Sequence, residues 1–140
     1  MKVDPKISVG VYVTGAELDP EQVHSVVELP NPTLKKKGER RTTSSGREFV
    51  VKAGAYSSVQ TVEMGDLLNH LRRLSDILPS PARLRSVGGV EDVFLDVLVL
   101  AEPDDDSTPG SASALLPADL WPVLNRIGLP VNITLAVVRS

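Results

Sequence analysis

In three segments of the chain, over positions 6–14, 92–101 and 130–138, every second residue is aliphatic and the residues between are of mixed kinds. A period of two residues is typical of β-strands that bury one face. We expect the aliphatic faces to meet helices: Ile7, Val9, Val11 and Val13; Val93, Leu95, Val97 and Val99; Val131, Ile133, Leu135 and Val137. Three such strands require a sheet with an apolar layer packed against it.

The second faces of the same strands are mixed in character. Tyr12 lies on the first strand, and Phe94, Asp96 and Leu98 share a face of the second strand. A face of this kind is neither a core nor a fully solvated surface, and it suits a partner or a covering helix. We predict that Tyr12, Phe94 and Leu98 contact a partner chain. The competing interpretation is that a helix over 119–127 folds across them.

Leucine recurs at helical spacing over residues 62–78, which predicts an amphipathic helix with Leu71 buried at its centre. His70 falls on the expected polar side of this helix. Two shorter helices are expected to begin after Asp19 and Asp119, because aspartate side chains accept hydrogen bonds from the first N–H groups of a helix.

The middle of the chain predicts a hairpin with arms at Thr42–Ser44 and Arg47–Ala53, turning at Ser45 and Gly46. Residues 82–90 are expected to form an irregular link. The composition of residues 102–114 predicts a mobile acidic loop.

The elements follow in the order β-α-(β)-β-α-β-α-β. This order predicts an α+β fold, namely a ferredoxin-like split βαβ sandwich extended by an additional helix and strand. A chain of 140 residues is the usual size of one domain, so residues 1–140 are expected to form a single domain.

The composition excludes several classes of protein. The chain contains no cysteine, which removes disulfide frameworks and Cys-based zinc sites. No apolar run approaches the ~20 residues of a membrane span, and the first residues have no apolar signal region, so we expect a cytoplasmic protein. The net charge of −3 does not attract nucleic acid to the protein as a whole.

No arrangement of residues predicts catalysis. There is no G-x-S-x-G motif and no phosphate-binding loop, and Asp104–Asp106 lack the spacing of a calcium loop. His24 and His70 are the only histidines, and neither has ligands at metal-binding spacing. We therefore expect a protein that is not an enzyme and that has no catalytic residue, cofactor or metal.

A cluster of basic residues is the one pronounced charge feature. It lies in a loop over residues 35–47 and comprises Lys35, Lys36, Lys37, Arg40, Arg41 and Arg47. We rank a solvated loop first, a site for an acidic protein partner second, and a phosphate-binding site for nucleic acid third.

Several segments together resemble the bacterial domain-of-unknown-function family 4279. They are Val9-Gly10-Val11-Tyr12-Val13-Thr14-Gly15, Leu18-Asp19-Pro20-Glu21-Gln22-Val23, Pro32-Thr33, Lys37-Gly38, Leu67-Leu68-Asn69-His70-Leu71 and Ile127-Gly128-Leu129. Phe49 stands near the position where this family often has a tryptophan. The resemblance implies no activity, because none is assigned to the family.

The leading hypothesis is a non-enzymatic protein-binding domain that meets a protein partner or a second copy of itself. By analogy with other small α/β proteins, it is an immunity-type inhibitor of a bacterial toxin. One alternative is a nucleic-acid-binding module that uses the loop 35–47 and Tyr12. Another is a small-ligand sensor in which Gly15 and the helix start that follows it bind an anion.

Overall fold

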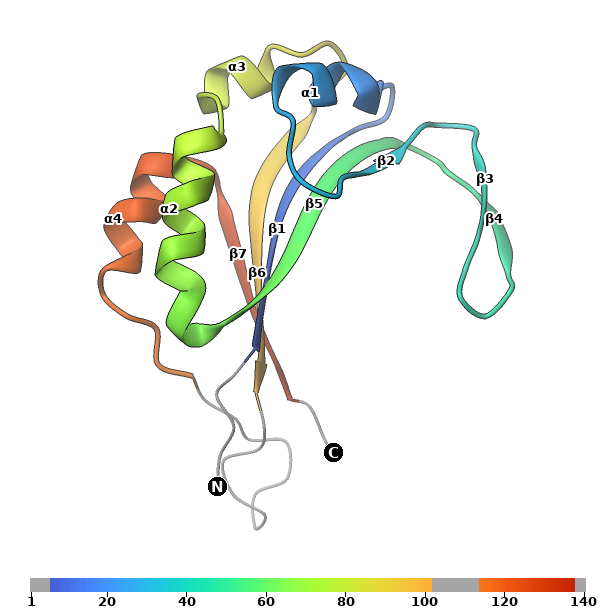
Figure 1. The fold of residues 1–140 in the computed structure, drawn as a ribbon. Helices are drawn as coiled ribbons and strands as arrows, with labels where there is room; N and C mark the ends of the chain where they lie inside the picture. Colours follow the sequence, from blue (N-terminus) through green and yellow to red (C-terminus); the bar gives the residue numbers. More distant parts are fainter. Residues whose placement is uncertain (1–5, 102–113, 138–140) are drawn as a thin grey trace. The chain divides into compact units, whose positions relative to one another are not determined.

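The computed structural model describes residues 6–101 and 114–137. The chain is a mixed α+β protein (Figure 1). Its elements are β1 (Lys6–Gly15), α1 (Pro20–Val26), β2 (Thr33–Lys35), β3 (Arg40–Thr42), β4 (Glu48–Val50), β5 (Gly54–Glu63), the 3₁₀ turn η1 (Met64–Asp66), α2 (Leu67–Ile77), α3 (Pro81–Arg85), β6 (Asp92–Ala101), α4 (Leu120–Ile127) and β7 (Val131–Val137). The expected acidic loop falls almost entirely outside the described residues.

Five strands form a mixed sheet in the order β2-β5-β1-β6-β7. β2 runs antiparallel to β5, and β6 runs parallel to β7. The remaining two strands, β3 and β4, form a separate antiparallel hairpin.

The strand prediction for Arg47–Ala53 is wrong in its extent. Only Glu48–Val50 are extended as β4, and the long sheet strand is β5, ten residues that sequence reasoning did not identify. β5 buries Tyr56 and Ser58 but exposes Val59, so its inward face does not stand out by hydrophobicity. Because β5 runs to Glu63, the helix expected over 62–78 begins only at Leu67. The expected irregular link over 82–90 overlaps the short helix α3.

The chain divides into two compact units. The first unit comprises residues 1–10, 59–78 and 95–140, and the second comprises residues 11–58 and 79–94. Strands β1, β5 and β6 contribute residues to both units. That residues 1–140 form a single domain therefore stays a prediction.

The core of the first unit lies between two helices and the aliphatic face of the sheet strands. Helices α2 and α4 pack against each other, on the same side of β6 and β7 (Figure 1). Leu71 is 1% exposed, as expected, whereas Ile77 at the end of α2 is 52% exposed. The buried residues of this core include Leu67, Leu71 and Leu74 of α2, Leu120, Val123 and Ile127 of α4, and Val97 and Val99 of β6.

Two expectations about the first unit are wrong. His70 does not lie on a polar side of α2 but is 5% exposed, because it stands three residues after Leu67 and four before Leu74 and so shares their buried helix face. Ile133 and Leu135 were expected under the helices but are 45% and 43% exposed. β7 is the last strand of the sheet, so the helix layer does not extend over these two side chains.

Close backbone contacts and one buried hydroxyl organise the second unit. A Cβ on Gly15 would lie 1.8 Å from the carbonyl oxygen of Gly89, so only glycine fits there. The hydroxyl of Tyr56 joins β5 to the residues that follow α1, donating a hydrogen bond to the carbonyl of Val27 and accepting one from the N–H of Leu29.

Candidate protein-binding face and basic arm

Two aromatic rings stack on the mixed face of the second unit. The rings of Tyr12 on β1 and Phe94 on β6 have centroids 5.2 Å apart and an interplanar angle of 9°. Both side chains are half-buried, whereas Val11, Val13 and Val93, which alternate with them, are buried. The structure thus brings together two of the three residues predicted for partner contact, and it leaves part of each ring accessible.

The first unit has a mixed face of its own, on β6 and β7. Leu98 is half-buried there and pairs in register with Thr134, which is exposed. Beside them the side-chain amide of Asn132 donates a hydrogen bond of 2.8 Å to the carboxylate of Asp96. The face therefore combines apolar and hydrogen-bonding groups, as interface cores and their rims do.

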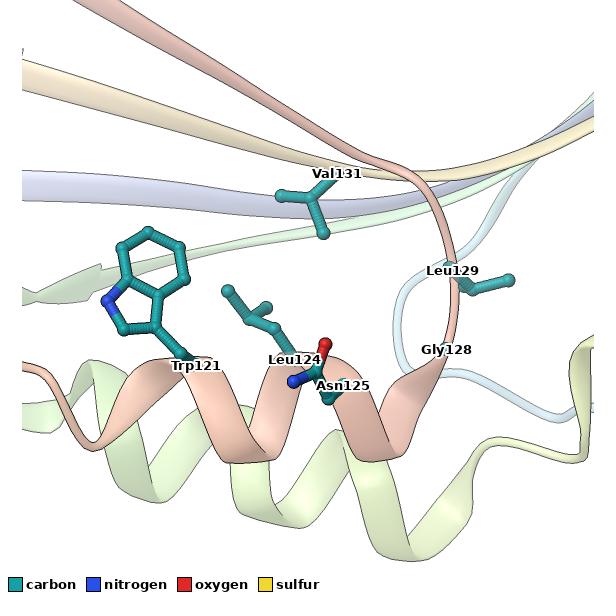
Figure 2. A pocket seen from close by; sticks show the side chains of 6 residues that line it. All are labelled: Trp121, Leu124, Asn125, Gly128, Leu129 and Val131. Atoms are coloured by element: carbon teal, nitrogen blue, oxygen red, sulfur yellow. The ribbon is translucent and has the colours of Figure 1, made fainter.

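Helix α4 packs on the opposite, aliphatic face. Trp121 and Leu124 of α4 line a pocket together with Val131 (Figure 2). Val131 is the register partner of buried Leu95, and neighbouring strands point paired residues to the same face. Within the described part of the first unit, α4 does not cover Leu98, and the competing interpretation of the mixed face fails there.

The basic residues lie on an arm of the second unit, residues 35–50, that contains the β3–β4 hairpin. The hairpin pairs Arg41 with Phe49 and Arg40 with Val50, and its turn places Gly46 at φ +87°. Its two apolar side chains are largely uncovered, with Phe49 38% and Val50 53% exposed. The expected hairpin and its turn at Gly46 are therefore present, with shifted arms.

Part of the positive charge on this arm is neutralised within the second unit. Lys37 forms an ion pair with Glu17. Arg41 forms an ion pair of 3.0 Å with Glu39 and also donates to the carbonyl of Leu34. Among the described residues, Lys35, Lys36 and Arg40 make no ion pair.

The contacts around Gly15 favour a structural role for this residue over anion binding. The backbone of Gly89 fills the space where a ligand would approach Gly15. The first N–H groups of α1 face the carboxylate of Asp19, which accepts a hydrogen bond from the N–H of Glu21. A carboxylate cap repels a second negative charge.

The two histidines have separate surroundings. Nδ1 of His24 lies 2.8 Å from the hydroxyl of Tyr56, and burial lowers the pKa of His70, with a smaller contribution from the charge of Arg73. No group of three potential metal ligands occurs within residues 6–101 and 114–137. The absence of enzyme activity and of cofactors stays a prediction.

Sequence reasoning missed a pocket of about 290 Å³ in the first unit. It lies between α4 and the start of β7 and is lined by Trp121, Leu124, Asn125, Gly128, Leu129 and Val131 (Figure 2). Trp121 is 48% exposed. The available signal was the position of this single tryptophan, which lies outside the apolar stripe of its helix.

No family model matches the chain, and the comparisons with curated proteins and with solved structures found no match. The resemblance to the domain-of-unknown-function family therefore stays a prediction. Of the helices in the described part of the chain, none has the length and apolar character required to cross a bilayer.

Proposed function

We propose that this chain is a protein-binding domain and that the stacked pair Tyr12 and Phe94 of the second unit receives the partner, with Leu98 of the first unit as a separate candidate contact. The observation that carries the proposal is the half-exposed stack of Tyr12 and Phe94. Aromatic side chains are enriched at interface centres because they bury a large area and lose little conformational entropy on binding.

A matched pair of variants tests this function. The tagged chain is purified from the cells that produce it, the proteins bound to it are identified, and the affinity of each purified candidate is measured. Phe94→Ser should weaken binding at least tenfold, the loss of about 1.4 kcal/mol expected for an aromatic anchor. Ile77→Ser changes an exposed residue (52%) at the end of α2, away from the mixed face, and should leave the affinity unchanged. Equal affinity of Phe94→Ser and the unmodified chain would refute the proposal.

The narrower form of this function is inhibition of a bacterial toxin, which rests on analogy with other small α/β proteins. Its test is co-expression with the toxins encoded beside this chain. The unmodified chain should restore growth and Phe94→Ser should not. If no neighbouring gene product is toxic, the partner belongs to another class.

Nucleic-acid binding is the second candidate, and the cations of the arm that form no ion pair support it. Lys35, Lys36 and Arg40 make no ion pair in the described part of the chain, so their charges remain available to phosphates. If they bind phosphate, Lys35→Gln with Lys36→Gln should reduce the slope of log affinity against log salt by about 2. Lack of RNA and DNA binding by the unmodified chain at low salt excludes this candidate.

The finer form of the fold is also a proposal. In the order β6-β1-β5-β2, the strands of the sheet suit a ferredoxin-like split βαβ core, with α1 after β1 and α2 between β5 and β6. Helix α4 and strand β7 are then the added helix and strand. An experimental structure would test this assignment through the directions of β5 and β6 relative to β1.

A further inference from the structure

The outer side of β7 is an open hydrogen-bonding edge. β7 is the last strand in the sheet order, and no other described strand pairs with its outer side. The N–H of Leu95 donates to the carbonyl of Pro130 at 2.8 Å. This hydrogen bond shows which residues of β7 direct their backbone groups toward β6. In a parallel pair alternate residues direct their backbone groups to the neighbouring strand, so Ile133 and Leu135 direct theirs outward.

The same two residues expose apolar side chains. Ile133 is 45% and Leu135 43% exposed, and they share a strand face with Val131, which lines the pocket beside Trp121. Trp121 is 48% exposed. Unpaired backbone groups and uncovered apolar side chains thus lie along one edge, and another β-strand would satisfy both.

β7 lacks the features that protect sheet edges from such pairing. Natural edge strands are short or carry lysine, proline or other charged residues. The strand at the other end of the sheet order, β2, is three residues long and includes Lys35. β7 has seven residues, Val-Asn-Ile-Thr-Leu-Ala-Val, with neither charge nor proline. This difference leaves the edge of β7 open to pairing with another strand.

We infer that β7 pairs antiparallel with β7 of a second copy of this chain, across a two-fold axis beside Thr134. This register places Ile133 opposite Leu135 of the other copy, so the four side chains bury one another and their outward backbone groups form hydrogen bonds.

Charge argues for a second copy as the occupant. A strand paired with itself puts residues of the same strand opposite one another, and like charges there are destabilising. β7 has none, and its centre places Thr134 opposite Thr134, a favourable cross-strand pair. A two-fold contact of this kind is closed and yields a dimer. It uses the outer edge of β7 and neither ring of the Tyr12–Phe94 stack, so it does not depend on the proposed function.

Sedimentation equilibrium tests the dimer, with one variant and one matched control. The unmodified chain should dimerise at about 10–100 μM, the range of a moderate interface. Leu135→Lys should weaken the dimer at least tenfold without altering the circular dichroism spectrum. Each copy then places a lysine next to the two-fold axis, where the two positive charges repel each other. Val59→Lys introduces the same charge at a similarly exposed aliphatic residue of β5 and should preserve the dimer.

Cross-linking tests the register, since the chain has no cysteine of its own. Opposed residues of an antiparallel pair have Cα atoms about 4.5–5.5 Å apart, within the range of a disulfide. Thr134→Cys should therefore form a covalent dimer under mild oxidation, whereas Thr61→Cys, at an exposed site on β5, should not. A monomer up to about 1 mM, a dimer unaffected by Leu135→Lys, or equal cross-linking of both cysteine variants would each overturn the inference. A monomer that binds a foreign extended peptide at β7 would also overturn it.

Discussion

Tyr56 links two segments of the second unit through one buried hydroxyl group. Its hydroxyl donates a hydrogen bond to the carbonyl of Val27 at 3.1 Å, and Nδ1 of His24 lies 2.8 Å from the same oxygen. The N–H of Leu29 donates to the same oxygen. Burial raises the pKa of the Tyr56 hydroxyl, so the group stays protonated at neutral pH.

Removal of this hydroxyl should destabilise the fold. Tyr56→Phe keeps the ring but leaves the buried N–H of Leu29 and the carbonyl of Val27 without their partner, and each lost partner typically costs about 1–3 kcal/mol. Urea unfolding measures the loss. Ser57→Ala, at a half-buried neighbour in β5 for which no side-chain hydrogen bond is found, is the control and should change the free energy of unfolding by less than about 0.5 kcal/mol. Equal stabilities of the two variants would contradict this role.

His70 should make the stability depend on pH. Burial lowers its pKa below the ordinary value of 6.5, so between the two pKa values the unfolded chain binds more protons than the native one. Above pH 6.5 the buried neutral His70 therefore costs no stability. As the pH drops from 6.5 toward the lowered native pKa, the free energy of unfolding should fall. His70→Gln should flatten this decline in urea unfolding curves recorded at a series of pH values. An unchanged slope in the variant would assign the decline to other groups.

At the scale of single elements, the hydrophobic period predicted the burial of central strands more reliably than the burial of strands at the edge of the sheet. The alternation over 92–101 matches β6 because both neighbours of β6 are present. β7 has the same alternation, yet its aliphatic face is partly exposed because no described strand lies on its outer side. β5 escaped prediction because its buried face includes Ser58, whose hydroxyl donates to the carbonyl of Pro30, a partner that no local pattern reveals.

For the candidate site too, the sequence pattern predicted which face a residue lies on but not which residues meet. The alternation placed Tyr12 and Phe94 on the second faces of their strands, but only the sheet order shows that their rings meet. The basic cluster was visible in the sequence, whereas the ion pair of Lys37 with Glu17 joins residues twenty positions apart. Pairings over such distances depend on tertiary structure, and composition does not encode them.

Helix α2 offers the direct test of how the first unit is packed. Leu71 is 1% exposed in the middle of the helix, and α4 packs beside it. Leu71→Ala should cost about 2–5 kcal/mol, the usual range for deleting a buried leucine. Arg72→Ala, at the exposed next position, should cost less than about 0.5 kcal/mol. A loss below half a kilocalorie for Leu71→Ala in urea unfolding would mean that another face of α2 is buried.

For the molecule as a whole, the central claim concerns the two faces of the sheet. Helices α2 and α4 cover the aliphatic face in the first unit, and in that unit the described residues place no helix over Leu98. A protein with one covered and one mixed face has a surface available for a partner, and the proposed function depends on it. If the chain itself buried this face, Phe94 and Leu98 would be ordinary core residues.

The free energy of unfolding of Leu98→Asp, compared with that of Val97→Asp, tests this claim most directly. Val97 is 4% exposed on the covered face, so its replacement buries an unpaired charge and should unfold the protein. Leu98 is half-buried on the mixed face, where the new carboxylate can reach water, and we predict a loss of about 1–2 kcal/mol with the fold retained. Unfolding of Leu98→Asp to the same extent as Val97→Asp would contradict the account.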